Sequence, residues 1–595
     1  MGLQLKTIDY LKKLASGNTD QIKGAEYSPQ KVLYDNKIES KEPLEEVRPE
    51  EEGVSSKYLV EFFKDVAKNR QVDAHGIMIL RHGRIIARAS FYPYQEEIWH
   101  ISHSLCKSLI GLGIGLVIED GLLDLNEKLL NIFKEKKNLF STFRLKDITV
   151  KHLLTMSSGI TVNELGAILE NDWVKMVMES NTAFNPGEKF FYNSMNSYML
   201  SAIIKEKTKK SVTELLQERI FTPLGITQFY WEQCPKGIEK GGWGLSMRLE
   251  DMAKIGQLYL QMGEWKGEQL IAREWIEEST KMQIDTVSDP DRYGYGYQVC
   301  IGPYPGSYQF NGMLGQNVIV IPDREMVIAT TGGSKGLSGA MDISPIVYQY
   351  FTDEMFQPEK SIEKKEREYQ ELQKVLRHLR YHEAYEDGME ITSRKLKEGR
   401  KKRNRWKRQE KNFALERIKG KTYEMEDSKI GLLPLFLQCF HNNYGKGIKE
   451  ISFSGEGKEV TIRIVEGEKE VFLPMGCDER SYKNTVLDFS GEVYQVAVKG
   501  SFRFDEEDRL VLKLMICFLE TSNTRLLKII FYPDDTIKMC FDELPHLQDL
   551  IDGVSYVLDS PVIEQFKLKD AGYVKYKMNY VMCPEIVGKL KIEGL

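Results

Sequence analysis

The sequence is 595 residues long, which exceeds what one hydrophobic core supports, so we expect roughly two to four domains. Hydrophobic residues make up 42% and charged residues 29%, which is the composition of an ordinary soluble globular protein. A net charge of −6 gives no global reason to expect nucleic-acid binding. No apolar run reaches the roughly 18 residues of a membrane-spanning helix, and lysines interrupt the N-terminal segment where a secretion signal would be apolar.

The eight cysteines are scattered along the chain without disulfide or metal-ligand spacing. We interpret most of them as reduced core thiols of a cytoplasmic protein. We expect no cofactor, no metal ion, no nucleic acid and no membrane contact. The sequence leaves the oligomeric state open.

Residues 1–47 are polar and mixed, and we interpret them as a loosely packed lead-in with one short helix near residues 6–16. A helix is predicted from Ser55 to about Asn69, with a serine cap and one apolar side. Two β-rich runs within residues 76–91 predict a hairpin, with His82 as a turn residue.

Residues 99–125 carry the strongest chemical signal of the chain. A polar start, an apolar run over 109–118 and a stop at Gly121 predict a buried helix with serine caps in front. Ser104 and Lys107 lie three residues apart, so their side chains share one face of the first turn. An amine one turn from a hydroxyl can activate it as a nucleophile, which is the Ser-x-x-Lys arrangement.

The spacing alone is weak support, because Ser28–Lys31 and Ser361–Lys364 repeat it without other chemical features. The tripled glycine over 111–115 adds a structural expectation. Each glycine costs helix propensity, so the pattern predicts close packing against neighbouring elements.

A series of helices is predicted after this segment, within 145–160, at 170–180, after the turn at 186–187, from 211 to just before 223, within 241–265, and near 273–282. Tyr192 and Ser194 lie between the turn at 186–187 and the following helix, on the kind of connecting loop that often carries function. His152 is on the polar side of its helix, and we interpret it as structural.

Three strand-like runs follow, at 293–301, 308–322 and 325–332. The chain to residue 355 thus reads as a hairpin, then helices, then an antiparallel meander, which favours an α+β fold. We expect the first hairpin and the last strands to join in one sheet, within a domain of residues 48–355.

Residues 356–412 are predicted to form a charged helical linker that ends in a basic run at 394–411. Such a run can bind RNA or an acidic surface, although we favour a solvated linker. From residue 413 to 595, short strands separated by turns predict a barrel or sandwich domain without a catalytic constellation.

Eight segments in order resemble landmarks of the serine-hydrolase family related to class C β-lactamases, DD-peptidases and EstB-type esterases. The resemblance covers roughly residues 45–352 and rests on RPEEEGVSSKYL, LRHGRII, SLCK, HLLTMSSGI, PGEKFFYNSMNSYMLSAII, GGWGLSMRLEDMAKIGQLYL, YGYGY and NGMLGQNVIVIPDREMVI. It implies a β-lactamase/transpeptidase-like domain with an antiparallel sheet flanked by helices. The C-terminal domain resembles the lipocalin-like barrels that accompany many of these hydrolases.

The resemblance also implies roles for individual residues. Ser104 corresponds to the acylated nucleophile, Lys107 to its activating base, and Tyr192 to the tyrosine that passes protons between nucleophile and leaving group. Lys107 and Tyr192 can each accept a proton, so we assign the base role to the pair. The backbone amides of Ser104 and Met313 correspond to the oxyanion hole.

Two departures from the family pattern bear on the substrate. Ser194 stands where β-lactamases and DD-peptidases have the asparagine of Tyr-x-Asn, and Phe310-Asn311-Gly312 stands where they have Lys-Thr-Gly or His-x-Gly. Phe310 cannot hold a carboxylate as a cation would. The resemblance, with these changes, implies substrate contacts by Ser194, Asn311 and Gly312, and favours a small ester or amide over a penicillin.

Other residues near these motifs are interpreted as structural. His100 and His103 flank the nucleophile without a carboxylate partner, Cys106 points inward, and Gln316 follows a glycine in a strand. Trp243 either lines the substrate site or lies in the core. The predicted function is therefore a serine hydrolase that forms an acyl-enzyme. The alternatives are a catalytically weak binding or regulatory protein on the same scaffold, and a nucleic-acid role for residues 394–411.

Overall fold

The computed structural model describes residues 9–10, 12–14, 21–22, 31–136, 139–286, 293–334, 342–356, 362–381, 415–456, 459–477, 481–546 and 583–591. The chain divides into two compact units. The first consists of Met1–Thr7, Gly24–Tyr381 and Glu520–Ser522, and the second of Ile8–Lys23, His382–Leu519 and Asn523–Leu595. Most of the helix expected near residues 6–16 and all of the basic run at 394–411 lie outside the described residues.

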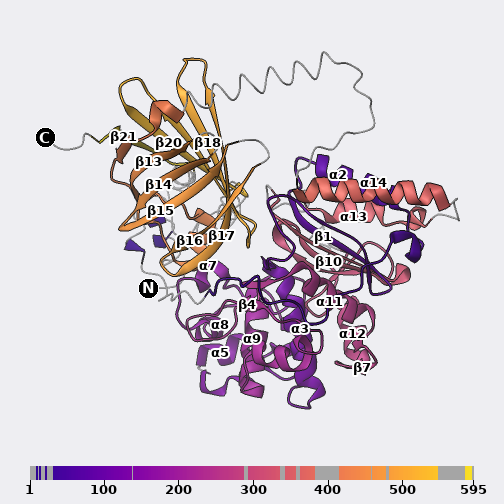
Figure 1. Cartoon of the computed structure of the whole chain (residues 1–595). Helices are drawn as coiled ribbons and strands as arrows, with labels where there is room; N and C mark the ends of the chain where they lie inside the picture. The colour runs from indigo at the N-terminus through magenta and orange to yellow at the C-terminus, as the bar shows by residue number, and fades with distance from the viewer. Residues whose placement is uncertain are drawn as a thin grey trace. The chain divides into compact units, whose positions relative to one another are not determined.

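The first unit is built around a six-stranded sheet with the order β2-β1-β11-β10-β9-β8. Its strands are β1 (Ala74–Arg81), β2 (Arg84–Ser90), β8 (Cys300–Ile301), β9 (Tyr308–Gly312), β10 (Gln316–Ile321) and β11 (Met326–Gly332). The pairing of β1 with β11 brings the first hairpin and the last strands into one sheet, as the sequence predicts (Figure 1). His82 has φ 49° in the β1–β2 turn, which confirms its place there.

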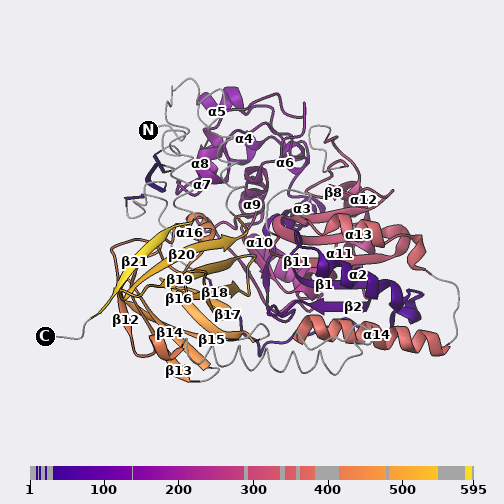
Figure 2. The same cartoon turned by 90° about the horizontal axis from the view of Figure 1, so that it is seen from above.

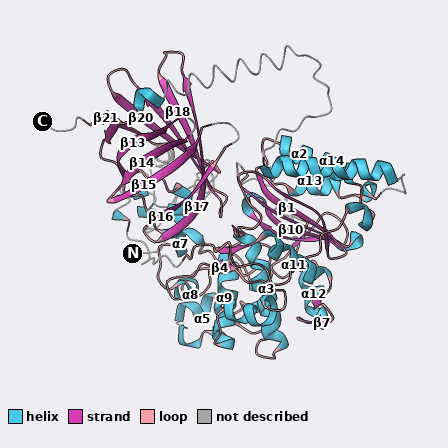
Figure 3. Cartoon of the chain, in the orientation of Figure 1, coloured by secondary structure: helices cyan, strands magenta, loops and turns pink. Residues whose placement is uncertain are grey.

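Helices cover both faces of this sheet, which gives the α+β architecture (Figures 2 and 3). One face carries α2 (Ser56–Lys68), α13 (Ser344–Tyr350) and α14 (Ile362–Tyr381), and the other carries α11 (Leu249–Leu260). The first unit also contains η2 (Pro49–Glu52), α4 (Leu129–Ile132), η4 (Lys134–Lys136), α5 (Leu139–Arg144), α6 (Val150–Leu154), α7 (Glu164–Ala167), α8 (Trp173–Met178), α9 (Ser194–Thr208), α10 (Val212–Leu216), η5 (Gln217–Phe221), α12 (Arg273–Thr280), η7 (Pro322–Arg324) and η9 (Asp353–Met355), and the short strands β3 (His100–Ile101), β4 (Phe229–Trp231), β5 (Leu245–Met247), β6 (Glu264–Trp265) and β7 (Glu268–Gln269).

The central helix α3 (Cys106–Glu119) is buried along almost its whole length. A Cβ atom on Gly111 would lie 2.8 Å from the Tyr297 carbonyl, and one on Gly115 would lie 2.4 Å from the Trp275 indole nitrogen. The predicted close packing of the glycines is therefore confirmed. The predicted serine cap is wrong: Ser102 has φ −92° and ψ −9°, a helical conformation in which it makes no capping hydrogen bond, and the 3-10 turn η3 (His103–Leu105) precedes α3 instead.

The run at 308–322 is not one strand but two antiparallel ones, β9 and β10, with Gln316 paired to Gly312. Met313 lies in the 3-10 turn η6 (Met313–Gly315), which connects the two strands. The reversal depends on positive φ angles of 67° at Leu314 and 96° at Gly315. Leucine rarely adopts such an angle, so a turn at this position is difficult to predict from residue types.

The second unit is a ten-stranded antiparallel sheet, in the order β15-β14-β13-β12-β21-β20-β19-β18-β17-β16, which closes into a barrel because β15 also pairs with β17. The elements are β12 (Thr422–Met425), α16 (Leu435–His441), β13 (Ile448–Glu456), β14 (Glu459–Glu466), β15 (Lys469–Gly476), β16 (Lys483–Phe489), β17 (Glu492–Phe504), β18 (Leu510–Phe518), β19 (Thr524–Phe531), β20 (Thr536–Leu544) and β21 (Glu585–Leu590). Alternating burial along β20 shows the period of two that defines an inner and an outer face.

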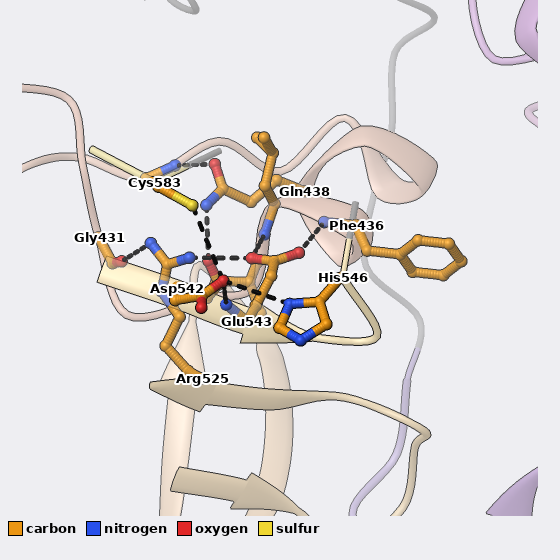
Figure 4. A network of polar contacts seen from close by, with 11 residues as sticks. Gly431, Phe436, Gln438, Arg525, Asp542, Glu543, His546 and Cys583 are labelled. Carbon is orange, nitrogen blue, oxygen red and sulfur yellow. Dashed lines mark hydrogen bonds and ion pairs between the residues drawn. The ribbon is translucent and has the colours of Figure 1, made fainter. Parts of the chain in front are cut away.

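A buried ion pair ties α16 to this barrel (Figure 4). Arg525 of β19 lies 2.8 Å from the Glu543 carboxylate of β20, and both side chains are at most 3% exposed. Glu543 also accepts hydrogen bonds from the amides of Leu435 and Phe436 at the start of α16, and Arg525 donates one to the Gly431 carbonyl. Each partner thus satisfies backbone groups that would otherwise be buried without a hydrogen bond.

Replacing Arg525 by methionine should destabilise the second unit by about 3 kcal/mol, because the Glu543 carboxylate would remain buried without its counter-ion. Hydrogen–deuterium exchange of the β19 and β20 amides measures this loss. In the double variant Arg525→Met/Glu543→Gln no charge is left unpaired, so much of the protection should return. Equal exchange in both variants would contradict this account.

Candidate active site

The predicted nucleophile and its amine are adjacent in the structure. Ser104 lies in η3 and Lys107 in the first turn of α3, and the Lys107 Nζ is 2.7 Å from the Ser104 Oγ. Lys107 is only 2% exposed, and its Nζ also donates a hydrogen bond of 2.6 Å to the Gly242 carbonyl. The amine is therefore fixed on one side by a backbone oxygen and faces the serine hydroxyl on the other.

Tyr192 closes the other side of this amine. It precedes α9, and the Lys107 Nζ lies 4.9 Å from the centre of its ring. The ring packs edge-on against Tyr295, with centroids 6.5 Å apart, beside Phe190. The structure thus brings Ser104, Lys107 and Tyr192 together.

The end of β9 packs directly on the nucleophile turn. A Cβ atom on Gly312 would lie 2.3 Å from the Ser102 carbonyl oxygen and 3.1 Å from the Leu105 amide nitrogen. Only glycine permits this close approach without movement of the backbone. Met313 follows at once, so its amide lies at the same end of β9 that meets the nucleophile turn.

Replacing Gly312 by alanine should lower kcat/KM by about 10²-fold, because β9 must retreat and carry the Met313 amide, the expected oxyanion donor, away from the nucleophile turn. Steady-state kinetics on an activated ester measure the effect. Gly306→Ala is the matched control: it precedes β9, has φ +73° and has no atom within 4 Å of the position that a Cβ would take, so it strains the backbone without a clash. A similar rate loss in both variants would contradict the role of the close approach.

Phe310 and Asn311 lie on opposite faces of β9. Phe310 is fully buried, and its ring packs edge-on against Tyr259 with centroids 4.7 Å apart. The Asn311 amide donates hydrogen bonds to Asn317, at 2.7 Å, and to Asp342, at 3.2 Å. The structure therefore gives Asn311 a bracing role between strands, and its predicted contact with substrate stays a prediction.

The remaining predicted residues have clear positions. Ser194 is the first residue of α9 rather than a loop residue, and it packs against Gly242, where a Cβ would lie 2.6 Å from the Ser194 Cβ. Gln316 is structural, because its side chain bonds both the amide and the carbonyl of Gly332. Trp243 is 7% exposed and stacks on Trp173, which favours the core alternative.

A buried histidine pair near the nucleophile turn could not be predicted from the sequence. His75 Nδ1 lies 2.9 Å from His100 Nε2, and His100 Nδ1 lies 2.9 Å from the Ile101 carbonyl. Burial lowers the pKa of His100 to about 4 and that of His103 to about 3. His75 is the second residue of β1 and lies 25 residues before His100, and no local spacing connects the two.

The described part of the chain contains no cluster of three or more His, Cys, Asp or Glu side chains that could hold a metal ion. None of the helices among the described residues combines the length and the apolar character that crossing a bilayer requires.

A family model described as Beta-lactamase matches residues 59–337. An uncharacterized protein of Alkalihalophilus pseudofirmus is 22% identical over 291 residues, which cover 44% of this chain and 78% of that protein. Protein flp of Staphylococcus aureus is 27% identical over 173 residues, or 26% of this chain and 34% of its own length, so the match spans about a third of that relative.

Two solved structures show the same kind of similarity. A putative 6-aminohexanoate-dimer hydrolase from Bacillus anthracis has 22% identity and a TM-score of 0.44, and the match covers 56% of this chain and 89% of that one. The octameric penicillin-binding protein homologue from Pyrococcus abyssi has 17% identity and a TM-score of 0.40, and the match covers 79% and 96%. The family model described as Beta-lactamase thus matches a segment within the first unit, residues 59–337, and this unit has a β-lactamase/transpeptidase-like arrangement of a sheet with helices on both faces.

Proposed function

We propose that this chain is a serine hydrolase that forms an acyl-enzyme at Ser104. The observation that carries the proposal is the 2.7 Å separation of the Lys107 Nζ and the Ser104 Oγ, with the amine buried and held by the Gly242 carbonyl. A neutral amine in this position can accept the hydroxyl proton as the oxygen attacks a carbonyl carbon. Base action belongs to Lys107 together with Tyr192, whose ring contacts the same amine.

The steps follow from these positions. Ser104 Oγ bonds to the acyl carbon, and its proton passes to the Lys107–Tyr192 pair. The amides of Ser104 and Met313 stabilise the oxyanion, and the pair returns the proton to the departing alcohol or amine. Water then attacks the acyl-enzyme by the same steps in reverse order, which releases the acid and restores Ser104.

The substrate we propose is a small ester or amide without a carboxylate next to the reacting bond. Phe310, which stands in place of the cation of the third motif, is buried against Tyr259 and offers no charge. A penicillin or a peptide C-terminus would therefore lack its usual counter-ion. We expect p-nitrophenyl butyrate to be hydrolysed faster than nitrocefin.

A fluorophosphonate probe tests the proposal directly. After incubation with the full chain, mass spectrometry should find the adduct on Ser104, and Ser104→Ala should abolish both labelling and turnover. Ser108→Ala is the matched control, because Ser108 is a buried serine of α3 whose Oγ bonds the Gln298 carbonyl. A folded wild-type protein without an adduct on Ser104 would reject the proposal in favour of a binding or regulatory protein.

A further inference from the structure

The loop between β4 and β5 reaches the catalytic amine. Its two branches pair through the Glu232 amide, which donates to the Gly244 carbonyl at 2.9 Å, and the Lys240 amide, which donates to the Glu232 carbonyl at 2.9 Å. Between these pairs lies Gly242, whose carbonyl accepts the hydrogen bond from Lys107. The position of this carbonyl therefore depends on how the loop is held.

A buried ion pair holds it. The Lys240 Nζ lies 2.5 Å from the Glu232 carboxylate, and the two side chains are 3% and 9% exposed. Removing two charges from water is costly, and well-packed apolar residues often stabilise a fold as well or better. An ion pair at this position therefore suggests a use for its charges beyond stability.

The pair faces the nucleophile turn. Glu232 acts electrostatically on His103, which precedes Ser104, and on Cys106, which lies between Ser104 and Lys107. Burial lowers the pKa of His103 to about 3 and raises the pKa of Cys106 to about 12, so both stay neutral near pH 7. The buried charges of this loop are those of Glu232, Lys240 and Glu239, and the Glu239 carboxylate accepts hydrogen bonds from the Val212 amide and the Gln233 side-chain amide.

We propose that the Glu232–Lys240 pair is a positioning device for Lys107: it holds the Gly242 carbonyl against the amine and keeps the charge around that amine balanced. The inference rests on the proposed function of Ser104 and Lys107. Tyr192, two residues before α9, is the remaining titratable side chain that contacts the amine among the described residues.

Two single variants should move the pH profile in opposite directions. Lys240→Met leaves the Glu232 carboxylate without its counter-ion, and an unbalanced negative charge beside the site favours the protonated forms of groups there, so the acidic limb of kcat/KM should move to higher pH by on the order of 1 unit. Glu232→Gln leaves the Lys240 cation unbalanced, and the limb should move to lower pH. A merely structural role would lower the rate in both variants without opposed shifts.

The double variant Glu232→Gln/Lys240→Met distinguishes the effect of the Gly242 carbonyl position from the effect of an unbalanced charge. It leaves no charge unbalanced, so the limb should stay in place while kcat falls by about tenfold with little change in KM, because the Gly242 carbonyl is no longer held. The double variant also tests the inference if a single variant fails to fold. Wild-type kcat in the folded double variant would overturn the inference.

Lys205→Met provides the matched control. The Lys205 Nζ donates to the Gly237 carbonyl of the same loop at 2.6 Å but is not part of the ion pair, so its loss should leave the limb in place. Fluorophosphonate labelling of the wild type distinguishes a failure of the proposed function from a failure of the inference. No label on Ser104 rejects the proposed function, whereas normal labelling and turnover with parallel or absent shifts in the single variants rejects the inference alone.

Discussion

Replacing Lys107 by methionine is expected to lower kcat/KM for ester hydrolysis by about 10⁴-fold, the upper range of general-base contributions. Methionine fills a similar volume but cannot accept the Ser104 proton across the 2.7 Å that separates Nζ from Oγ. Tyr192 would remain but would lack the amine against its ring. Steady-state kinetics and the rate of fluorophosphonate labelling both measure the loss.

A second buried lysine supplies the control for this variant. Lys254 on α11 is fully buried, and its Nζ bonds the Ser40 hydroxyl and the Leu224 carbonyl. Lys254→Met should therefore lower the stability of the first unit while kcat stays within about twofold of the wild type, because this amine makes no contact with the nucleophile turn. If both variants lose activity equally, the effect of Lys107→Met is structural and its role as base is wrong.

The sequence predicts those parts of the fold that local patterns determine. The apolar side of residues 55–69 predicts α2, and the turn at His82-Gly83 predicts the first hairpin, because each depends on contacts a few residues apart. The Ser104–Lys107 contact is predictable for the same reason, since one helical turn separates the two residues.

Several features that depend on distant residues could not be predicted, although the pairing of the first hairpin with the last strands in one sheet was. Ser102 resembles a helix cap in the sequence, yet β5 fixes it in a helical conformation through the hydrogen bond from its amide to the Leu245 carbonyl. The Glu232–Lys240 pair and the bracing of Asn311 by Asp342 likewise join residues whose spacing matches no motif. Only the sheet and loop topology of the first unit brings these groups together.

The buried histidines predict an acid-labile first unit. His100 Nδ1 faces the Ile101 carbonyl and must donate its proton there, so His100 Nε2 is left to accept the hydrogen bond from His75 Nδ1. His75 Nε2 is then a bare nitrogen, buried without a hydrogen-bond partner among the described residues. Protonation of either ring would break this series of hydrogen bonds or place a buried cation beside the other ring. Burial therefore holds the pKa of His75 well below its ordinary value.

The contribution of these histidines to stability should therefore fall as the pH falls below 6.5. The unfolded chain binds protons at the ordinary histidine pKa of 6.5, whereas the folded state resists protonation of His100 until about pH 4 and of His103 until about pH 3. Between these values the unfolded state carries more protons, so the free energy of unfolding rises with pH and is fully regained above about 6.5. At about pH 5 each of these two histidines should cost about 2 kcal/mol, or about 4 kcal/mol together.

Urea unfolding of the full chain at about pH 7.5 and about pH 5, followed by tryptophan fluorescence, measures this loss, because the described tryptophans all lie in the first unit. His100→Gln keeps a polar side chain but cannot titrate, so its loss of stability between the two pH values should be smaller by about 2 kcal/mol. His378→Gln on α14 is the control and should keep the wild-type slope, since this side chain is only partly buried. A ring that is buried in its neutral form must contribute to the pH dependence of stability wherever the unfolded chain can bind the proton. If the free energy of unfolding of His100→Gln depends on pH as that of the wild type does, other groups therefore cause the acid lability.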